Sequence, residues 1–309
     1  MIDKSHRGEI NMIRLTDFEK KTSDPVLVTY ASTPSGNVPV YEISSFHSLT
    51  QLIGFGKYMN REYGNVYLRG QTSLYAGNLP PSALRSSSIN YALRISQYKN
   101  HIQESMAQTK NFKDRDALII EPMLQHYGIR TYWLDIVDNV WIALWFAVHK
   151  TNSKIIDGRE YIHIFENDED QYGYVFLISS DATKEDESKP GVYNGSQTTL
   201  VDLRKAVPSY FLRPHAQHAL MLKKNSADPN DFADYSDRIV AIAKISVANA
   251  LKWIGQTGLL SVQSLFPPPY YDTGYEQLLN EYKIPESCKE SFPIKNYVQL
   301  FGSIQDITY

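Results

Sequence analysis

The chain has 309 residues, of which 42% are hydrophobic and 21% charged, a balance that is typical of a packed globule and excludes a disordered chain. The formal net charge of -3 excludes an overall positive field for nucleic acid, but it is compatible with a local basic groove. The single cysteine, Cys288, excludes an internal disulfide framework and fits a reducing compartment. There is no apolar signal core at the N-terminus, and the longest apolar stretch, 140–148, is about half of a membrane span. We therefore expect a cytoplasmic protein.

Residues 1–44 are predicted to form an N-terminal extension with two short strands. Residues 26–30 and 38–41 are rich in β-branched and aromatic side chains, and turn-forming residues separate them at 34–37. Residues 45–58 then carry apolar side chains mostly three or four positions apart, which predicts a helix.

A strand is predicted at 66–69, followed by a long charged helix over 89–121 that ends before Pro122. A short helix around 123–127 stops at Gly128, and a connection leads on through 130–135. Asn139 is placed to cap a strongly apolar helix, which we expect to be core. That helix covers 140–149, and further strands are predicted at 161–165, 174–178, 198–203, 219–222 and 239–245, with helices at 247–257 and 274–282.

The chain shows no internal repeat and no long linker between independent domains. Helices are predicted mainly in the N-terminal half and strands in the C-terminal half, an order that indicates the α+β class. We divide the chain into the extension 1–44, one domain over 45–282, and a tail over 283–309 that contains a short strand.

Four separated pieces of sequence occur in the order that is typical of one family. The pieces are Tyr-Leu-Arg-Gly-Gln at 67–71 with Pro-Ser-x-x-Arg at 81–85, Gln-His-Tyr-Gly to Ala-Leu-x-Phe-Ala at 125–147, Arg-x-x-x-Gln at 213–217, and 265–274. With these pieces the chain resembles the FRG family, named for its aromatic-Arg-Gly motif, from about residue 46 to residue 280. Arg130 and Tyr132 depart from the family, which tends to have Pro and Arg at these positions.

FRG domains are distantly similar to ADP-ribosyltransferases, and that similarity implies a split, mainly antiparallel sheet with an N-terminal helical portion. It also implies NAD as co-substrate and cleavage of the nicotinamide–ribose bond through an oxocarbenium-like transition state. Such enzymes carry a polar or cationic residue on an early strand, an aromatic or hydroxyl group in the middle, and Glu, Asp or Gln on a late strand.

The resemblance gives three residues a catalytic role. Arg69 would hold the diphosphate or a ribose of NAD with its guanidinium, although it could instead bond a carboxylate such as Asp135. Tyr127 would stack on nicotinamide, and Gln217 would hydrogen-bond the ribose 2′-hydroxyl. Because an amide cannot act as a general base, Glu121, His126 and Asp135 are the candidate bases. The residues expected to bind the cofactor are Gly70, which would let backbone approach the ligand, and Gln71, Arg85, His126, Thr131, Asp135 and Arg213.

The resemblance favours an NAD-dependent ADP-ribosyltransferase that is a toxin-like effector, of the kind used in anti-phage defence. It would modify a macromolecule, RNA ahead of protein, and would need a neutralising antitoxin. The alternatives are a non-catalytic module that binds a nucleotide or a protein, and a sensor whose catalytic residues have decayed. His215 and His218 have a spacing that two metal ligands can use, but no third ligand is evident, and no metal is expected.

Overall fold

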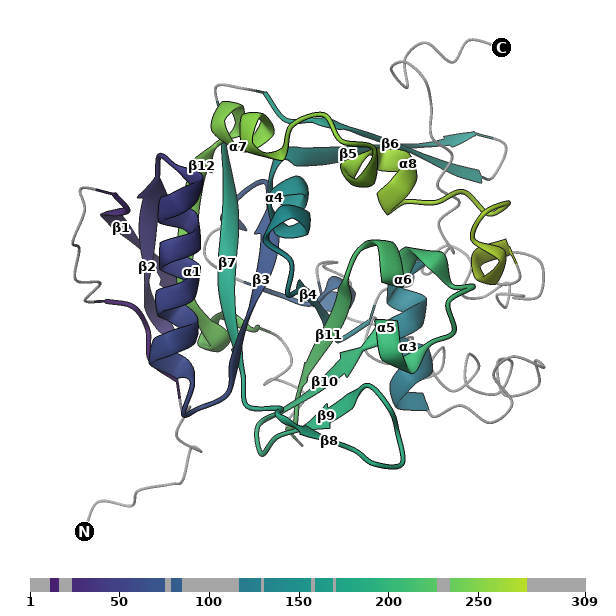
Figure 1. Ribbon diagram of the computed structural model, residues 1–309, viewed down its shortest axis with the longest axis horizontal. Coiled ribbons are helices and arrows are strands. Elements are labelled where there is room, and N and C mark those ends of the chain that lie inside the picture. Colours follow the sequence, from purple (N-terminus) through teal and green to yellow (C-terminus); the bar gives the residue numbers. More distant parts are fainter. Residues whose placement is uncertain are drawn as a thin grey trace.

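The computed structural model describes residues 12–16, 24–75, 79–84, 117–128, 131–156, 159–168, 171–226 and 234–276. Ten strands of this part form one sheet, and two more form a separate ribbon (Figure 1). The strands are β1 (Val26–Thr33), β2 (Gly36–Ile43), β3 (Asn65–Gln71), β4 (Leu134–Val137), β5 (His149–Ile156), β6 (Arg159–Glu166), β7 (Tyr172–Ser180), β8 (Lys184–Glu185), β9 (Val192–Asn194), β10 (Thr198–Asp202), β11 (Ala219–Lys224) and β12 (Ile239–Ser246).

Helices flank the sheet and give the α+β class that the sequence predicts. Two of them, α1 and α4, pack on the strands at the centre of Figure 1, while α3, α5 and α6 lie beside the strands at its lower right. The helices are α1 (Phe46–Asn60), α3 (Ala117–His126), α4 (Val140–Val148), α5 (Leu203–Ala206), α6 (Leu212–Ala216), α7 (Val247–Ile254) and α8 (Val262–Leu265), with 3-10 turns η2 (Ser82–Leu84), η4 (Ser236–Arg238) and η5 (Gly258–Leu260).

The large sheet consists of two halves whose strands are joined by a single pair of residues. Its order is β1-β2-β12-β7-β3-β4-β11-β10-β9-β8, and neighbours are antiparallel except β12 and β2. Most neighbours share a long register, but β3 and β4 pair only at Leu68 and Val137. Beyond that pair the two strands separate, so side chains that follow it on either strand border an opening in the sheet.

Helix α4 lies unusually close to the first half of the sheet. Asn139 caps it, as predicted, by accepting hydrogen bonds from the N–H groups of Trp141 and Ile142. A Cβ on Gly70 would lie 1.9 Å from the carbonyl oxygen of Ala143, so glycine is required where β3 passes under the helix. This gives Gly70 a packing role that the sequence did not predict, because the backbone that approaches it belongs to α4.

The hairpin predicted in the N-terminal extension and the helix that follows it are confirmed. β1 and β2 form the hairpin, and β2 also pairs with β12, so the hairpin is one end of the main sheet. In α1, Ser45 accepts the N-cap hydrogen bond from the Ser48 N–H. Leu49 and Leu52 of α1 are buried in the core shared with the sheet.

Three predicted boundaries are wrong. Residues 134–137 form β4, although they read as a connection, because they pair with β11. Helix α3 continues through Pro122 instead of breaking there; an interior proline costs about 3 kcal/mol, and burial of Ile120 and Met123 on either side offsets it. Helix α7 ends at Ile254, where Gly255 adopts a positive φ of 63°.

Most of the helix predicted at 89–121, most of that at 274–282, and the tail lie outside the described residues. Among the described residues, no helix is both long and apolar enough to span a membrane.

Candidate functional site

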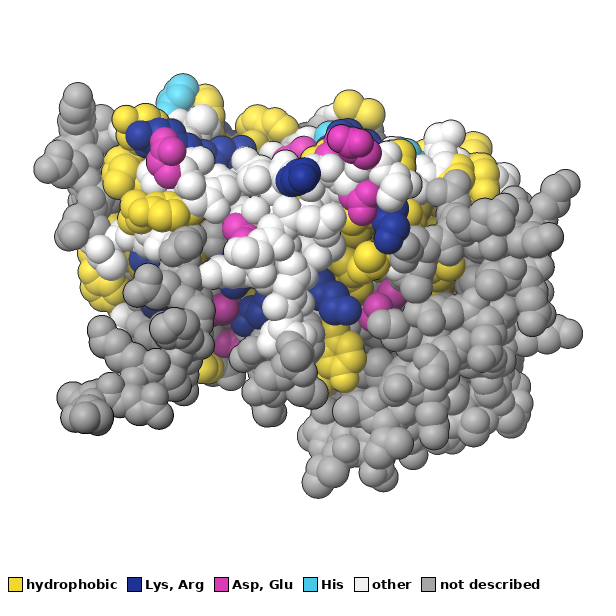
Figure 2. Space-filling model, turned by 90° about the horizontal axis from the view of Figure 1, so that it is seen from below, with side chains coloured by type: hydrophobic (Ala, Val, Ile, Leu, Met, Phe, Trp, Pro, Cys, Tyr) yellow, Lys and Arg dark blue, Asp and Glu magenta, His cyan; other side chains and the backbone are white. Residues whose placement is uncertain are grey.

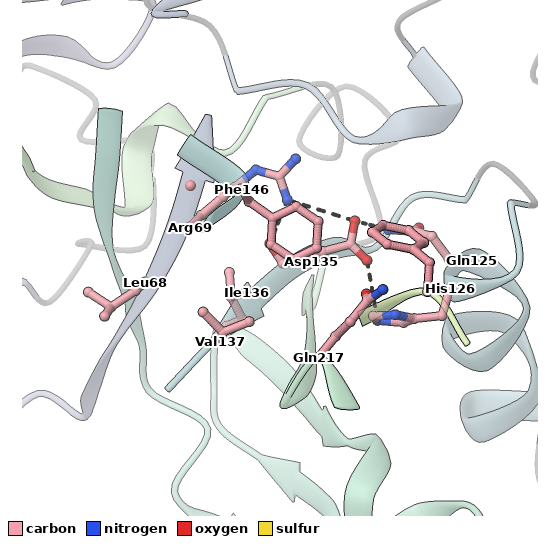
Figure 3. Close-up of a pocket in the computed structure, with 11 residues that line it drawn as sticks. Leu68, Arg69, Gln125, His126, Asp135, Ile136, Val137, Phe146 and Gln217 are labelled. Carbon is pink, nitrogen blue, oxygen red and sulfur yellow. Dashed lines mark hydrogen bonds and ion pairs between the residues drawn. The ribbon is translucent and has the colours of Figure 1, made fainter. Parts of the chain in front are cut away.

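A pocket of about 240 Å³ opens where β3 and β4 separate. Both strands contribute to it, β3 with Arg69 and β4 with Asp135, and the end of α3 and the last turn of α4 close it (Figure 3). The lining residues are Leu68, Arg69, Gly70, Gln125, His126, Asp135, Ile136, Val137, Phe146, Gln217 and Phe266. These residues come from six separate parts of the chain, which only the fold brings together.

The carboxylate of Asp135 is at the centre of this pocket. Its side chain is 41% exposed, whereas the groups around it are largely buried. Gln125 Nε2 donates to Asp135 Oδ2 at 2.7 Å, and His126 Nε2 lies 3.5 Å from Oδ1 (Figure 3). Arg69 Nη1 donates to the main-chain oxygen of Asp135 at 2.6 Å and lies 3.7 Å from Oδ2. Arg69 therefore ties β3 to β4, the structural role considered from sequence, and at the same time gives the pocket a cation.

A chain of hydrogen bonds fixes the orientation of Gln125. The Thr131 hydroxyl donates to Gln125 Oε1 and accepts from the Trp133 N–H at 3.1 Å. The Thr131 N–H in turn donates to Ser82 Oγ at 3.0 Å. Because Oε1 is occupied by a hydroxyl donor, the Gln125 amide N–H groups must face Asp135. Thr131 is buried behind the pocket wall, so the structure places it as a support and not in contact with a ligand.

His126 and Gln217 form the side of the pocket opposite Arg69. Burial lowers the pKa of His126, although Asp135 raises it in opposition, and the ring is neutral near pH 7. Gln217 hydrogen-bonds His126, and its Nε2 donates to the main-chain oxygen of Leu265 at 2.7 Å. The structure thus brings Arg69 and Gln217 to one pocket, as expected.

Tyr127 does not reach this pocket, which corrects the expectation that it stacks on a ligand. It is fully buried; its hydroxyl donates to Asp272 Oδ2 at 2.8 Å, and burial together with that carboxylate raises its pKa. His126 is the last residue of α3 and Tyr127 follows it directly, so their side chains point in different directions and only His126 faces the opening. Arg213 is also buried away from the pocket: its guanidinium lies 4.8 Å from the centre of the Tyr127 ring, and Nη1 donates to the His126 oxygen at 2.8 Å.

A second cavity of about 820 Å³ shares Arg69, Gly70 and Phe146 with the first. It continues past Gln71 and along the start of β5, where Lys150 adds a second cation. Of the other residues expected at the site, Glu121 lines neither cavity, and Arg85 lies outside the described residues. Among the described residues, no group of three or more His, Cys, Asp or Glu side chains is placed to hold a metal.

Sequence reasoning missed six residues that line the pocket: the aliphatic Leu68, Ile136 and Val137, and also Gln125, Phe146 and Phe266. Phe146 was assigned to the core because every position of α4 is apolar, and nothing in the sequence sets it apart from its neighbours. The ring centroids of Phe146 and Phe266 lie 6.2 Å apart, and their planes make an angle of 77°, an edge-to-face contact. The two rings give the pocket an aromatic wall. Gln125 and Phe266 both lie within pieces that carry the family resemblance.

Comparison with known proteins gives one match. A family model described as FRG domain matches residues 64–155, which include Arg69, Gln125, His126, Asp135 and Phe146. Gln217 and Phe266 lie beyond the matched range. Neither the curated proteins nor the solved structures gave a match to the chain.

Proposed function

The chain contains an FRG domain, and from that premise we propose that it is an NAD-dependent ADP-ribosyltransferase whose reaction takes place at Asp135. One observation carries the proposal. Of the described residues that line the two connected cavities, Asp135 is the one carboxylate, and it is partly exposed between the cation of Arg69 and the amide of Gln125. The near-separation of β3 from β4 at this point agrees with a split sheet of the transferase kind.

The surroundings of Asp135 suit a reaction that passes through a cationic sugar. When the bond between C1′ of ribose and nicotinamide breaks, nicotinamide leaves with the bonding electrons and C1′ gains positive character. A fixed carboxylate stabilises that charge more than it stabilises the substrate, which is the requirement for catalysis. Donors from Gln125 and Arg69 hold the Asp135 carboxylate in a fixed orientation, while its exposed edge can accept a hydrogen bond from a ribose hydroxyl.

Geometry favours Asp135 among the candidate bases. Glu121 lines neither cavity. His126 lines the pocket, but its Nε2 is buried and lies 3.5 Å from Asp135 Oδ1, whereas the Asp135 side chain is 41% exposed to the opening. In the proposed transfer the acceptor forms a bond to C1′, and its proton passes to Asp135 and then to solvent. Gln217 would orient the sugar by hydrogen bonding, since it cannot take the proton.

The rest of NAD would occupy the second cavity. Its volume of about 820 Å³ suits a ligand of this size, since small-molecule sites are commonly about 300–1,000 Å³. Arg69 stands where the two cavities meet and Lys150 lies farther along, so a diphosphate would lie between two cations. Phe146, which lines both cavities, takes the stacking role that the sequence gave to Tyr127.

The acceptor is proposed to be a macromolecule, RNA ahead of protein, and the protein a toxin-like effector that works in the cytoplasm and needs a neutralising partner. Figure 2 shows basic and acidic side chains interspersed on the described part of one face. Recognition of RNA would then depend on contacts beside the two cavities more than on a broad positive surface.

Release of nicotinamide from NAD tests the proposal. We expect Asp135→Asn to lower the rate about 10² to 10³-fold, in line with the loss of one electrostatic catalytic group. Asp138→Asn is the matched control, because the Asp138 side chain is equally exposed at 41% but pairs with Arg204 outside both cavities. Full release by Asp135→Asn would refute the role of Asp135. Tight NAD binding by the wild type without release would favour the non-catalytic module.

A further inference from the structure

The two outer strands of the sheet differ in how they are protected from pairing. At one end, β8 has only two residues, Lys184 and Glu185, and both are charged and exposed. At the other end, β1 has eight residues, Val-Leu-Val-Thr-Tyr-Ala-Ser-Thr, and none of them is charged. Three of its apolar side chains are well exposed, Val26 at 41%, Val28 at 44% and Tyr30 at 45%.

Outer strands are usually short, charged or interrupted by proline, because their unpaired N–H and C=O groups can bind another strand. β8 follows that rule, whereas β1 has a single protective feature, a bulge between Leu27 and Thr29. From Thr29 to Thr33 the strand is regular, and no described strand pairs with its outer side. Among the described residues, these five regular, uncharged positions therefore have no strand on their outer side.

The register of the hairpin shows which groups point outward. Tyr30 lies opposite Pro39, and proline has no N–H to donate. In an antiparallel ladder, hydrogen-bonded and non-hydrogen-bonded pairs alternate, so Tyr30 and Pro39 form a pair of the second kind. The N–H and C=O of Tyr30, and those of Ser32 two positions on, consequently point away from β2. Those of Ala31 point toward β2.

We propose that β1 pairs in antiparallel fashion with β1 of a second copy of this chain, about a two-fold axis at Ala31. In this arrangement Tyr30 of each copy lies opposite Ser32 of the other copy. Each of these two pairs is joined by two main-chain hydrogen bonds, from the N–H of one residue to the C=O of the other. The small Ala31 side chains meet at the axis, where antiparallel strands approach most closely. No like charges face each other, because β1 has none, and a two-fold axis closes the assembly at two copies.

The proposed dimer is independent of the reaction at Asp135. In the strand order, β2, β12 and β7 separate β1 from β3, so both pockets would remain open. The inference depends only on the sheet order, the hairpin register and the composition of β1.

The mass of the protein in solution tests the proposal. The wild type should have twice the chain mass of 35.3 kDa by light scattering at micromolar concentration. Tyr30→Pro removes an outward N–H without removing a bond to Pro39, and it should give a monomer with an unchanged circular dichroism spectrum. Tyr30→Val keeps the N–H and should remain dimeric. Lys184→Pro, at the opposite outer strand, should also remain dimeric.

A cysteine crosslink tests the register even if Tyr30→Pro fails to fold. In a Cys288→Ser background, Ala31→Cys should form a disulfide between two copies under mild oxidation. Cα atoms of such a pair lie about 4.5 Å apart, within the range that a disulfide spans. Val28→Cys, at the bulge, should not crosslink. A monomeric wild type would overturn the proposal, because β1 would then be unpaired, covered by the chain itself or bound by another protein. The absence of a crosslink in Ala31→Cys would also overturn it.

Discussion

His126 and Tyr127 are consecutive residues, yet they belong to two polar clusters with opposite relations to solvent. The pocket cluster (Arg69, Gln125, His126 and Asp135) surrounds a carboxylate that is 41% exposed. The sealed cluster (Tyr127, Arg213, Asp272 and Tyr275) surrounds a carboxylate that is fully buried. Both clusters join distant parts of the chain with the same kinds of side chain.

The difference shows that a buried polar cluster in this chain is a candidate functional site only where it borders a cavity, because the sealed cluster serves packing alone. Asp272 accepts from the Tyr127 hydroxyl at 2.8 Å and from the N–H groups of Arg213 and Tyr275, each at 3.0 Å. Arg213 then holds the His126 main chain. The sealed cluster thus fixes the last turn of α3, and it sets the position from which His126 faces Asp135.

The largest effect should follow from breaking the sealed cluster. Asp272→Ala leaves three buried donors without their acceptor, and each unsatisfied buried donor typically costs about 1–3 kcal/mol, so the total should be about 3 kcal/mol or more. We expect the free energy of unfolding, measured with urea, to fall by about that amount. Asp135→Ala in the exposed pocket should change it far less. Equal losses for the two variants would contradict the distinction between the clusters.

The next effect concerns the contact between β3 and α4 that shapes the pocket. Gly70→Ala would place its Cβ 1.9 Å from the Ala143 oxygen and 2.7 Å from the Ala147 nitrogen, both backbone atoms that cannot rotate away. We expect a loss of about 3 kcal/mol in the free energy of unfolding, at the upper end for overpacking.

Gly54→Ala is the matched control for Gly70→Ala. Gly54 lies inside α1, and nothing lies within 4 Å of a Cβ added there. Alanine is a better helix former than glycine by about 1 kcal/mol, so this variant should be slightly more stable than the wild type. Should Gly70→Ala be as stable as Gly54→Ala, the proposed packing of α4 on β3 would be wrong.

The contrast between His126 and Tyr127 also explains how far the sequence could lead. Periodicity and capping residues predicted α1, α4 and the first hairpin, because those signals are local. The resemblance to the FRG family was given for residues 46–280, and the matching family model confirms it over residues 64–155. The resemblance could not show which residues of Gln-His-Tyr face the opening, since that depends on how α3 is rotated against the sheet.

Two other features could not be predicted for the same kind of reason. The four residues of β4 are too few to show a period, and they become a strand only because β11 supplies partners. Phe146 resembles its apolar neighbours in α4 and differs from them only in lying beside the gap between β3 and β4. Contacts between distant parts of the chain, and not local sequence preference, determine the strand β4 and the position of Phe146.

A smaller effect should come from the support of Gln125. On the proposed function, Thr131→Val removes the hydroxyl that holds Gln125 Oε1, so the amide can turn away from Asp135. We expect kcat for nicotinamide release to fall about tenfold, equivalent to about 1.4 kcal/mol, with KM for NAD nearly unchanged. Thr131→Ser keeps the hydroxyl and should restore the rate. A defect shared by both variants would mean that Thr131 acts through packing alone.

The smallest effect should be a dependence of stability on pH that traces to His126. Burial lowers its pKa in the folded protein below the ordinary value of about 6.5. Below that pH the unfolded chain binds a proton that the folded chain does not, so this histidine should reduce the free energy of unfolding as pH falls from 7 to 5. The slope it adds cannot exceed about 1.4 kcal/mol per pH unit, and His126→Gln should remove it. Because Asp135 opposes the lowering, Asp135→Asn should depress the pKa further and extend the pH range over which stability is lost. A pH profile that is identical in the wild type and His126→Gln would place the imidazole in contact with solvent, contrary to its position between Asp135 and Gln217.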